Sequence, residues 1–120
     1  MDDRRNLNSG AEWEGKVGYS RAVRVGKMIF VSGTTAADLE SGPPVGGTDA
    51  GEQASEALRR IDFALNQLGS GLGDVVRTRI YVTNISDWPA IGEAHRQSFG
   101  ATRPASTMVE VSKFVSPDYL

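Results

Sequence analysis

Apolar residues recur at helical spacing through the middle of the chain, between Asp49 and Gly69. The apolar positions lie three or four residues apart and share one helix face: Ala54, Ala57, Leu58, Ile61, Leu65 and Leu68. This spacing predicts an amphipathic helix. We expect it to begin at Asp49, whose carboxylate can accept from the free N–H groups of the first turn, with Glu52 reaching back. Gly69 is the expected stop.

Upstream of this helix, two apolar runs predict a β-hairpin. Residues 19–25 alternate, so Tyr19, Arg21, Val23 and Val25 are expected on one face of a strand. Residues 28–32 form a second run that is apolar on both faces. The two residues between the runs include Gly26, which is typical of a tight hairpin turn.

Downstream, the pattern predicts strand, helix and strand. Residues 75–83 alternate between apolar and polar side chains, which indicates a strand with one buried face. Asp87 is the expected cap of a second helix that ends at Gly100. Its inner stripe is expected to consist of four residues: Ile91, Ala94, His95 and Phe99. A last strand is expected from Pro104 to about Ser112.

The remaining segments are polar or rich in turn-forming residues. Residues 1–15 are expected to form an N-terminal arm, and residues 33–47 a loop. The order strand, strand, helix, strand, helix, strand predicts an α+β fold, in which two helices pack on one face of a mixed sheet. At 120 residues the chain supports a single domain, residues 1–120.

Composition narrows the classes of function. The net charge is −2 and no basic face is apparent, so nucleic acid is not an expected partner. No apolar run is long enough to cross a membrane, and the polar N-terminus does not resemble a secretory signal, which favours a cytoplasmic location. With no cysteine and one histidine, no metal site is expected. No cofactor is expected either.

The candidate catalytic residues each have a structural alternative. His95 lies on the inner stripe of the second helix, where a packed, hydrogen-bonded histidine is favoured over a catalytic one. Ser32, Ser106 and Thr107 are hydroxyls with no general base that the sequence assigns, so nucleophilic hydrolysis is disfavoured. Gly33 is either a turn at the end of a strand or a backbone N–H donor at the mouth of a cleft.

Several separated segments of the chain form an ordered set of short motifs: Val17-Gly18-Tyr19, residues 25–33, residues 73–78, Tyr81-Val82-Thr83, Pro104-Ala105 and Val109-Glu110-Val111. In sequence and in order they resemble signatures of the RidA (YjgF) family of small enamine/imine deaminases. The resemblance runs from about residue 17 to residue 120. It implies a chorismate mutase-like homotrimer whose clefts between subunits bind a small molecule and hydrolyse an enamine or imine, releasing ammonia.

The resemblance also assigns site residues. Tyr19 matches a tyrosine that positions water, and the backbones of Gly33 and Met108 match groups that face the ligand. Ser106 stands where active members carry an arginine that pairs with the substrate carboxylate. The family's distal glutamate would fall just after Leu120, so we expect the chain to be truncated.

The serine in place of arginine leaves the function open. Arg21, expected on the face of Tyr19, is the favoured substitute anchor, ahead of Arg103, which is three residues before Ser106. Intersubunit salt bridges are the alternative role for both arginines. One hypothesis is a deaminase whose substrate differs from the usual 2-aminoacrylate type. The other is a non-catalytic, metabolite-binding trimer on the same scaffold.

Overall fold

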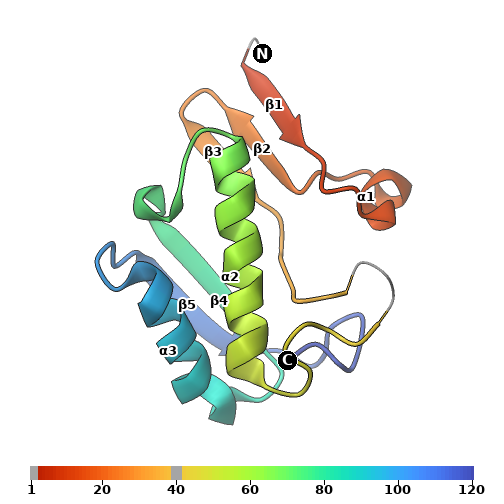
Figure 1. Cartoon of the computed structure of the whole chain (residues 1–120), viewed down its shortest axis with the longest axis vertical. Helices are drawn as coiled ribbons and strands as arrows, with labels where there is room; N and C mark the ends of the chain where they lie inside the picture. The colour runs from red at the N-terminus through yellow and green to blue at the C-terminus, as the bar shows by residue number, and fades with distance from the viewer. Residues whose placement is uncertain (1–2, 39–41) are drawn as a thin grey trace.

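The computed structural model describes residues 3–38 and 42–120 (Figure 1). Its helices and strands are, in chain order, β1 Arg4–Leu7, α1 Glu12–Val17, β2 Ala22–Val25, β3 Met28–Val31, α2 Ala50–Gln67, β4 Arg77–Val82, α3 Trp88–Phe99 and β5 Ala105–Glu110. Short 3₁₀ turns, η1 Leu72–Asp74 and η2 Ile85–Asp87, precede β4 and α3. From β2 to β5 the order is the predicted one. Part of the predicted loop, residues 39–41, lies outside the described residues.

The N-terminal half holds an antiparallel sheet in the order β1-β2-β3. The predicted hairpin joins β2 to β3, and Val23 pairs with Phe30 across it. Gly26 has a φ of 58° in the turn, a conformation that glycine adopts without steric cost. The first hairpin strand begins at Ala22, three residues later than the predicted start at Tyr19.

The C-terminal half holds a parallel pair, in which Ile80 of β4 pairs with Met108 of β5. Both α2 and α3 lie on one side of this pair (Figure 1). The α+β class, with two helices on one face, is therefore confirmed. The described strands are hydrogen-bonded as one antiparallel sheet and one parallel pair, rather than as one continuous mixed sheet.

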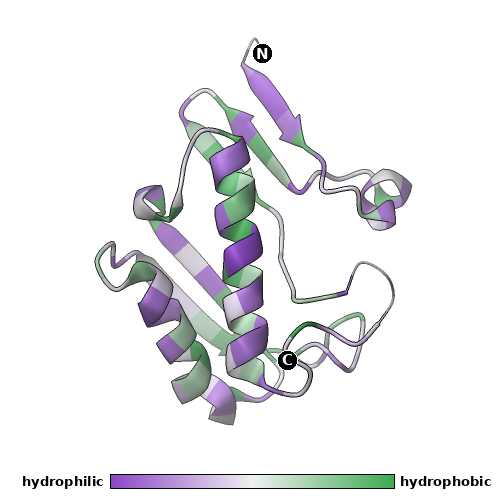
Figure 2. Ribbon diagram, viewed as in Figure 1, coloured by the Kyte–Doolittle hydropathy of each residue, from purple (hydrophilic) through white to green (hydrophobic). Residues whose placement is uncertain are grey.

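Helix α2 connects the two groups of strands through two hydrophobic clusters. Near its C-terminus, Ala64 and Leu68 pack with Ala22 of β2. Near its N-terminus, Ala50 packs with Val82 of β4 and with Ile91 of α3. Figure 2 shows hydrophilic and hydrophobic positions alternating along α2, as the apolar spacing predicted. One helix thus supplies the core of both halves.

The predicted ends of α2 are confirmed, whereas the predicted cap of α3 is not. The Asp49 carboxylate accepts from the backbone N–H of Glu52 at 3.1 Å, and Gly69 follows the helix with a φ of 83°. Helix α3 does begin after Asp87, but the side chain of Asp87 makes no capping hydrogen bond. The Asn84 side chain instead accepts from the Ser86 N–H in the preceding turn.

The expected N-terminal arm is regular structure over much of its length. Strand β1 is mostly hydrophilic (Figure 2) and is held by backbone pairing with β2, so it carries no apolar periodicity that sequence reasoning could detect. Helix α1 is only six residues long and buries Glu14. The Glu14 carboxylate accepts hydrogen bonds from the backbone N–H and the hydroxyl of Ser9.

The C-terminal segment is fastened to α2 by the buried side chain of Gln53. Its amide nitrogen donates to the carbonyls of Gly47 at 2.6 Å and Asp118 at 2.9 Å, and its oxygen accepts from the Leu120 N–H at 3.0 Å. The Leu120 carbonyl in turn accepts from Thr83, just after β4. Within the described part of the chain, no helix is long and apolar enough to span a membrane.

Candidate functional site

A cavity of about 320 Å³ lies beside Tyr19 on the three-stranded sheet. Its lining comes from all three strands and from the segment before β2: Arg4, Asn6, Gly18, Tyr19, Ser20, Val23, Phe30, Val31 and Ser32. Cross-strand register places Asn6, Val23 and Phe30 on one face of the sheet. Because the neighbouring positions on these strands pack toward α2, the cavity opens on the face that α2 leaves uncovered.

Local backbone contacts fix the position of Tyr19. The N–H groups of Gly18 and Tyr19 both donate to the Glu14 carbonyl at 2.9 Å, which ends α1 and starts the run into β2. Gly18 has a φ of 94°, in the left-handed region that favours glycine. On the other side of the cavity, the Ser32 hydroxyl donates to the Ser20 carbonyl at 2.6 Å. The aromatic ring and the hydroxyl of Ser32 are thus presented by ordered backbone.

Arg21, expected on the strand face of Tyr19, does not line this cavity, and both residues lie before β2. Its guanidinium donates to the carbonyl of Gly33, just after β3. The guanidinium Nε is buried and has no hydrogen-bond partner among the described residues. In the single chain, Arg21 therefore supports the Gly33 turn rather than offering its charge beside Tyr19.

Ser106 and Met108 lie together on β5, on the side that faces the helices. The Ser106 hydroxyl accepts from the Thr78 hydroxyl at 2.7 Å. Thr78 Oγ1 also lies 2.9 Å from Nε2 of His95 on α3. Met108 packs against the cluster formed by Ala50, Val82 and Ile91. Strand alternation accounts for this common direction, since positions 106 and 108 share a face.

His95 is packed and hydrogen-bonded, as its place in the helical pattern predicted. Its ring centroid lies 4.7 Å from that of Phe99, at an interplanar angle of 47°. Burial among these groups lowers the pKa of His95 below its usual value, because burial penalises the charged imidazolium. The imidazole is therefore neutral at pH 7.

Arg103 lies outside β5, in a left-handed backbone conformation with a φ of 54°. Its N–H donates to the Phe99 carbonyl at 2.7 Å, which fixes the chain between α3 and β5. The side chain is exposed. Such a conformation is uncommon for a residue other than glycine, asparagine or aspartate, and nothing in the sequence pattern indicated it.

The single chain does not gather the expected site residues into one pocket. Gly33, Arg103, Ser106 and Met108 do not line the cavity beside Tyr19. Sequence reasoning missed Phe30 and Val23 as lining residues, although the hairpin register could have identified them as a cross-strand pair. It also missed Thr78, because the contact between Thr78 and Ser106 depends on the parallel pairing of β4 with β5.

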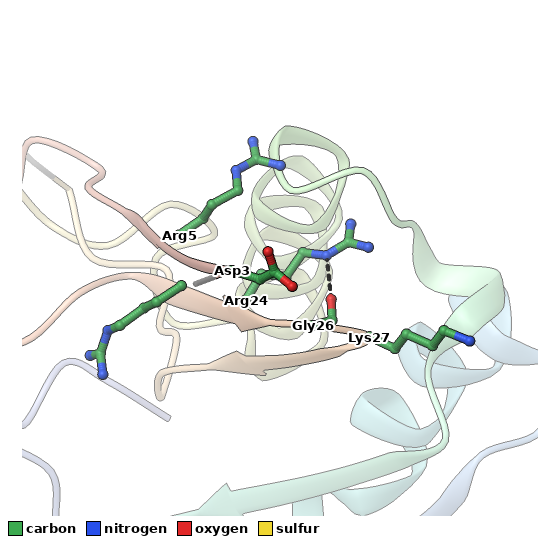
Figure 3. Close-up of a pocket in the computed structure, with 6 residues that line it drawn as sticks. Asp3, Arg5, Arg24, Gly26 and Lys27 are labelled. Atoms are coloured by element: carbon green, nitrogen blue, oxygen red, sulfur yellow. Dashed lines mark hydrogen bonds between the residues drawn. The ribbon is translucent and has the colours of Figure 1, made fainter. Parts of the chain in front are cut away.

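A second hollow, of about 480 Å³, lies at the β2–β3 turn and is lined by Asp3, Arg4, Arg5, Arg24, Gly26 and Lys27. Figure 3 shows Arg5, Arg24 and Lys27 pointing in different directions. Arg5 donates to the Gln67 carbonyl and Arg24 to the Leu68 carbonyl, both at the C-terminal end of α2. Cations are favourable at this end of a helix, so these arginines are explained as caps.

No group of three or more histidine, aspartate or glutamate side chains within residues 3–38 and 42–120 could hold a metal ion. The polar groups beside Tyr19 are hydroxyls, an amide and a guanidinium. This set suits hydrogen bonding to a small polar molecule.

The fold and this cavity define a small α+β protein with a polar hollow on the helix-free face of its antiparallel sheet. The chain belongs to the RidA/YjgF family, because residues 11–120 match the family model described as endoribonuclease L-PSP. A Mycobacterium tuberculosis member of the YjgF family has a crystal structure similar to this fold, with a TM-score of 0.88 and 49% identity. That similarity covers 98% of this chain and 92% of the other.

Two relatives are similar over most of the chain. An uncharacterized protein of Streptomyces coelicolor is 34% identical over 111 residues, which span 92% of this chain and 81% of that protein. The human 2-iminobutanoate/2-iminopropanoate deaminase is 33% identical over 109 residues, or 90% of this chain and 79% of the human protein. The family expected from the sequence motifs is thus confirmed.

Proposed function

We propose that this protein is a hydrolytic deaminase of a small enamine or imine. The observation that carries the proposal is the Tyr19 cavity, found in a chain that is 33% identical to a human imine deaminase. An enamine first tautomerises to its imine. Water then adds to the imine carbon, the carbon–nitrogen bond breaks, and a carbonyl compound and ammonia leave. The Tyr19 hydroxyl orients the attacking water, and the backbone N–H groups of Gly33 and Met108 hold the ligand.

The proposed reaction takes place in a cleft between subunits of a cytoplasmic homotrimer. Large apolar side chains remain exposed on the helix-free face of the strands, including Phe30, Tyr81 and Val109. Exposed apolar groups of this kind mark surfaces that associate. Ser106 is exposed on β5, and a neighbouring copy whose Tyr19 cavity lies against this strand would bring the two together, which one chain cannot do.

A non-catalytic, metabolite-binding trimer is the second candidate. The observation that favours it is the engagement of Arg21 by the Gly33 carbonyl, together with a serine at position 106. Neither residue offers a free positive charge to a carboxylate beside Tyr19. The family model's description as an endoribonuclease does not lead us to propose RNA cleavage, because the chain has a net charge of −2 and two of the cations at the β2–β3 turn, Arg5 and Arg24, cap α2.

Turnover of imines separates the two candidates. Purified protein should accelerate ammonia release from at least one imine in a panel generated from amino acids and their amides by an oxidase. Tyr19→Phe should lower this rate about 10- to 100-fold, as expected when a positioned proton-transfer or water-orienting group is lost. Tyr119→Phe, outside the cavity, is the matched control and should leave the rate unchanged.

The alternative makes a different prediction. A binding protein would show saturable thermal stabilisation by a small molecule without any turnover across the panel, because a ligand specific to the folded state raises apparent stability. That result would replace the deaminase proposal.

A further inference from the structure

A chain of three hydrogen-bonding side chains runs from the helix layer to the surface of β5. It consists of His95 on α3, Thr78 on β4 and Ser106 on β5, with separations of 2.9 Å and 2.7 Å. Ser106 is exposed at the outer end, whereas Thr78 and His95 are half-buried behind it. We propose that these hydrogen bonds make Ser106 the specificity residue for an uncharged carbonyl or amide group of the ligand, in preference to a carboxylate.

The direction of the hydrogen bonds supports this role. The Thr78 hydroxyl has one hydrogen and donates it to Ser106, so the contact with His95 requires Nε2–H to donate to Thr78. Ser106 then has its own hydrogen free for a ligand acceptor. In the opposite arrangement, Ser106 donates to Thr78 and Thr78 donates to Nε2 of His95. Ser106 then accepts a hydrogen bond from a ligand donor. An amide group can use either arrangement.

The charged side chains next to His95 and Thr78 are engaged elsewhere, and Arg4, which lines the Tyr19 cavity, donates to Asn6. His95 is neutral at pH 7, because its pKa is lowered by burial. Arg96, the next residue on α3, is paired with Glu93. On β4, Arg77 is on the opposite side of the strand from Thr78 and donates to Thr107.

A carboxylate placed against Ser106 would therefore lose its hydration and gain only uncharged hydrogen-bond partners. Uncharged hydroxyls do not offset the desolvation of an anion, whereas they do satisfy a carbonyl or an amide. The inference rests on the proposed cleft. It assigns the deaminase an uncharged imine as substrate, for example one derived from an amino-acid amide.

Matched probes test this selectivity without requiring turnover. Affinities of the full-length protein for 2-oxobutanamide and 2-oxobutanoate are measured by calorimetry at pH 7. The two probes differ only in the amide or carboxylate group. The amide should bind about tenfold more tightly, the scale of one well-made hydrogen bond. Tighter binding of the carboxylate, or binding of neither probe, would overturn the proposal.

Substitutions at Ser106 assign the preference to that residue. Ser106→Ala should bring the affinity ratio close to one, and Ser106→Arg should invert it in favour of the carboxylate. Thr107→Ala, on the other face of β5, is the control and should keep the wild-type ratio. If Arg103→Ala abolishes the preference while Ser106→Ala does not, Ser106 is not the specificity residue.

A positioning role for His95 needs a readout other than stability. His95→Gln retains an N–H donor and should preserve the affinity ratio, whereas His95→Phe should lower it at unchanged fold, as judged by circular dichroism. Equal ratios in both variants would remove His95 from the proposal. Preference for the amide without any turnover would reject the deaminase but keep this inference. Turnover together with tighter binding of the carboxylate would reject this inference but keep the deaminase.

Discussion

The two sides of the strands differ in what they require from the rest of the molecule. On the side covered by α2 and α3, one chain closes its own core, and Leu68 is only 2% exposed. On the opposite side, Phe30 is 57% and Tyr81 52% exposed. A chain of this size thus completes one apolar face by itself and leaves the other open. The covered side carries folding stability, and the open side is suited to association.

The candidate site is divided in the same way. The Tyr19 cavity lies on the open side of the antiparallel sheet, whereas Ser106 and Met108 face the helices at the parallel pair. A site built from both parts needs a second copy of the chain. Stability and assembly should therefore separate between the two sides.

The largest effect is expected from shortening a side chain on the covered side. Leu68→Ala removes a fully buried side chain that packs against Ala22 and Ala64, so it should cost about 2–5 kcal/mol of unfolding free energy. Chemical denaturation measures the change. Phe63→Ala, at an exposed position of the same helix, should cost much less. Similar losses in both variants would contradict the assignment of stability to the covered side.

A charge on the open side should act on assembly instead. Tyr81→Glu places a carboxylate in the exposed apolar surface, so it should dissociate the proposed trimer into single copies, as measured by light scattering. Its circular dichroism spectrum should remain that of a folded chain. Ser55→Glu, on exposed α2 surface, should remain trimeric. A wild-type protein that is already monomeric would refute the trimer.

The smallest effect concerns acid stability at the edge of the covered side. The hydrogen bond from Arg59, together with Arg60, lowers the pKa of Glu56 from 4.5 to about 2. A depressed carboxyl pKa stabilises the fold above pH 4.5, and this contribution is lost as the pH falls toward 2. Glu56→Gln should therefore flatten the stability profile between pH 4.5 and 2, by about 1 kcal/mol after allowance for solvent screening.

A matched pair provides the control for Glu56. Glu93 also has its pKa lowered to about 2, through its hydrogen bond to Arg96, but both side chains of this pair are more than half exposed. Glu93→Gln should change the acid profile less than Glu56→Gln does. Urea denaturation across this pH range measures both variants. An equal or larger change for Glu93→Gln would show that burial does not decide the strength of these pairs.

Local rules account for the parts of the fold that were predicted. The Asp49 cap, the apolar stripe of α2, the glycine turn at Gly26 and the alternation in β4 each depend on residues close together in the chain. Strand β1 and helix α1 were missed because backbone pairing holds β1, and α1 is too short to show a period. The prediction of an Asp87 cap was wrong, since its side chain makes no capping hydrogen bond, whereas Asn84 caps the preceding 3₁₀ turn.

The sequence by itself determined the family, the α+β class and the set of candidate residues, because spacing and motif order survive without coordinates. Only the tertiary structure decided which of those residues meet. There, Arg21 donates to the Gly33 carbonyl, and Tyr19 lines a hollow together with Phe30. Ser106 is linked through Thr78 to His95. The reason is physical: these contacts join segments far apart in the chain, and strand register and helix packing set them.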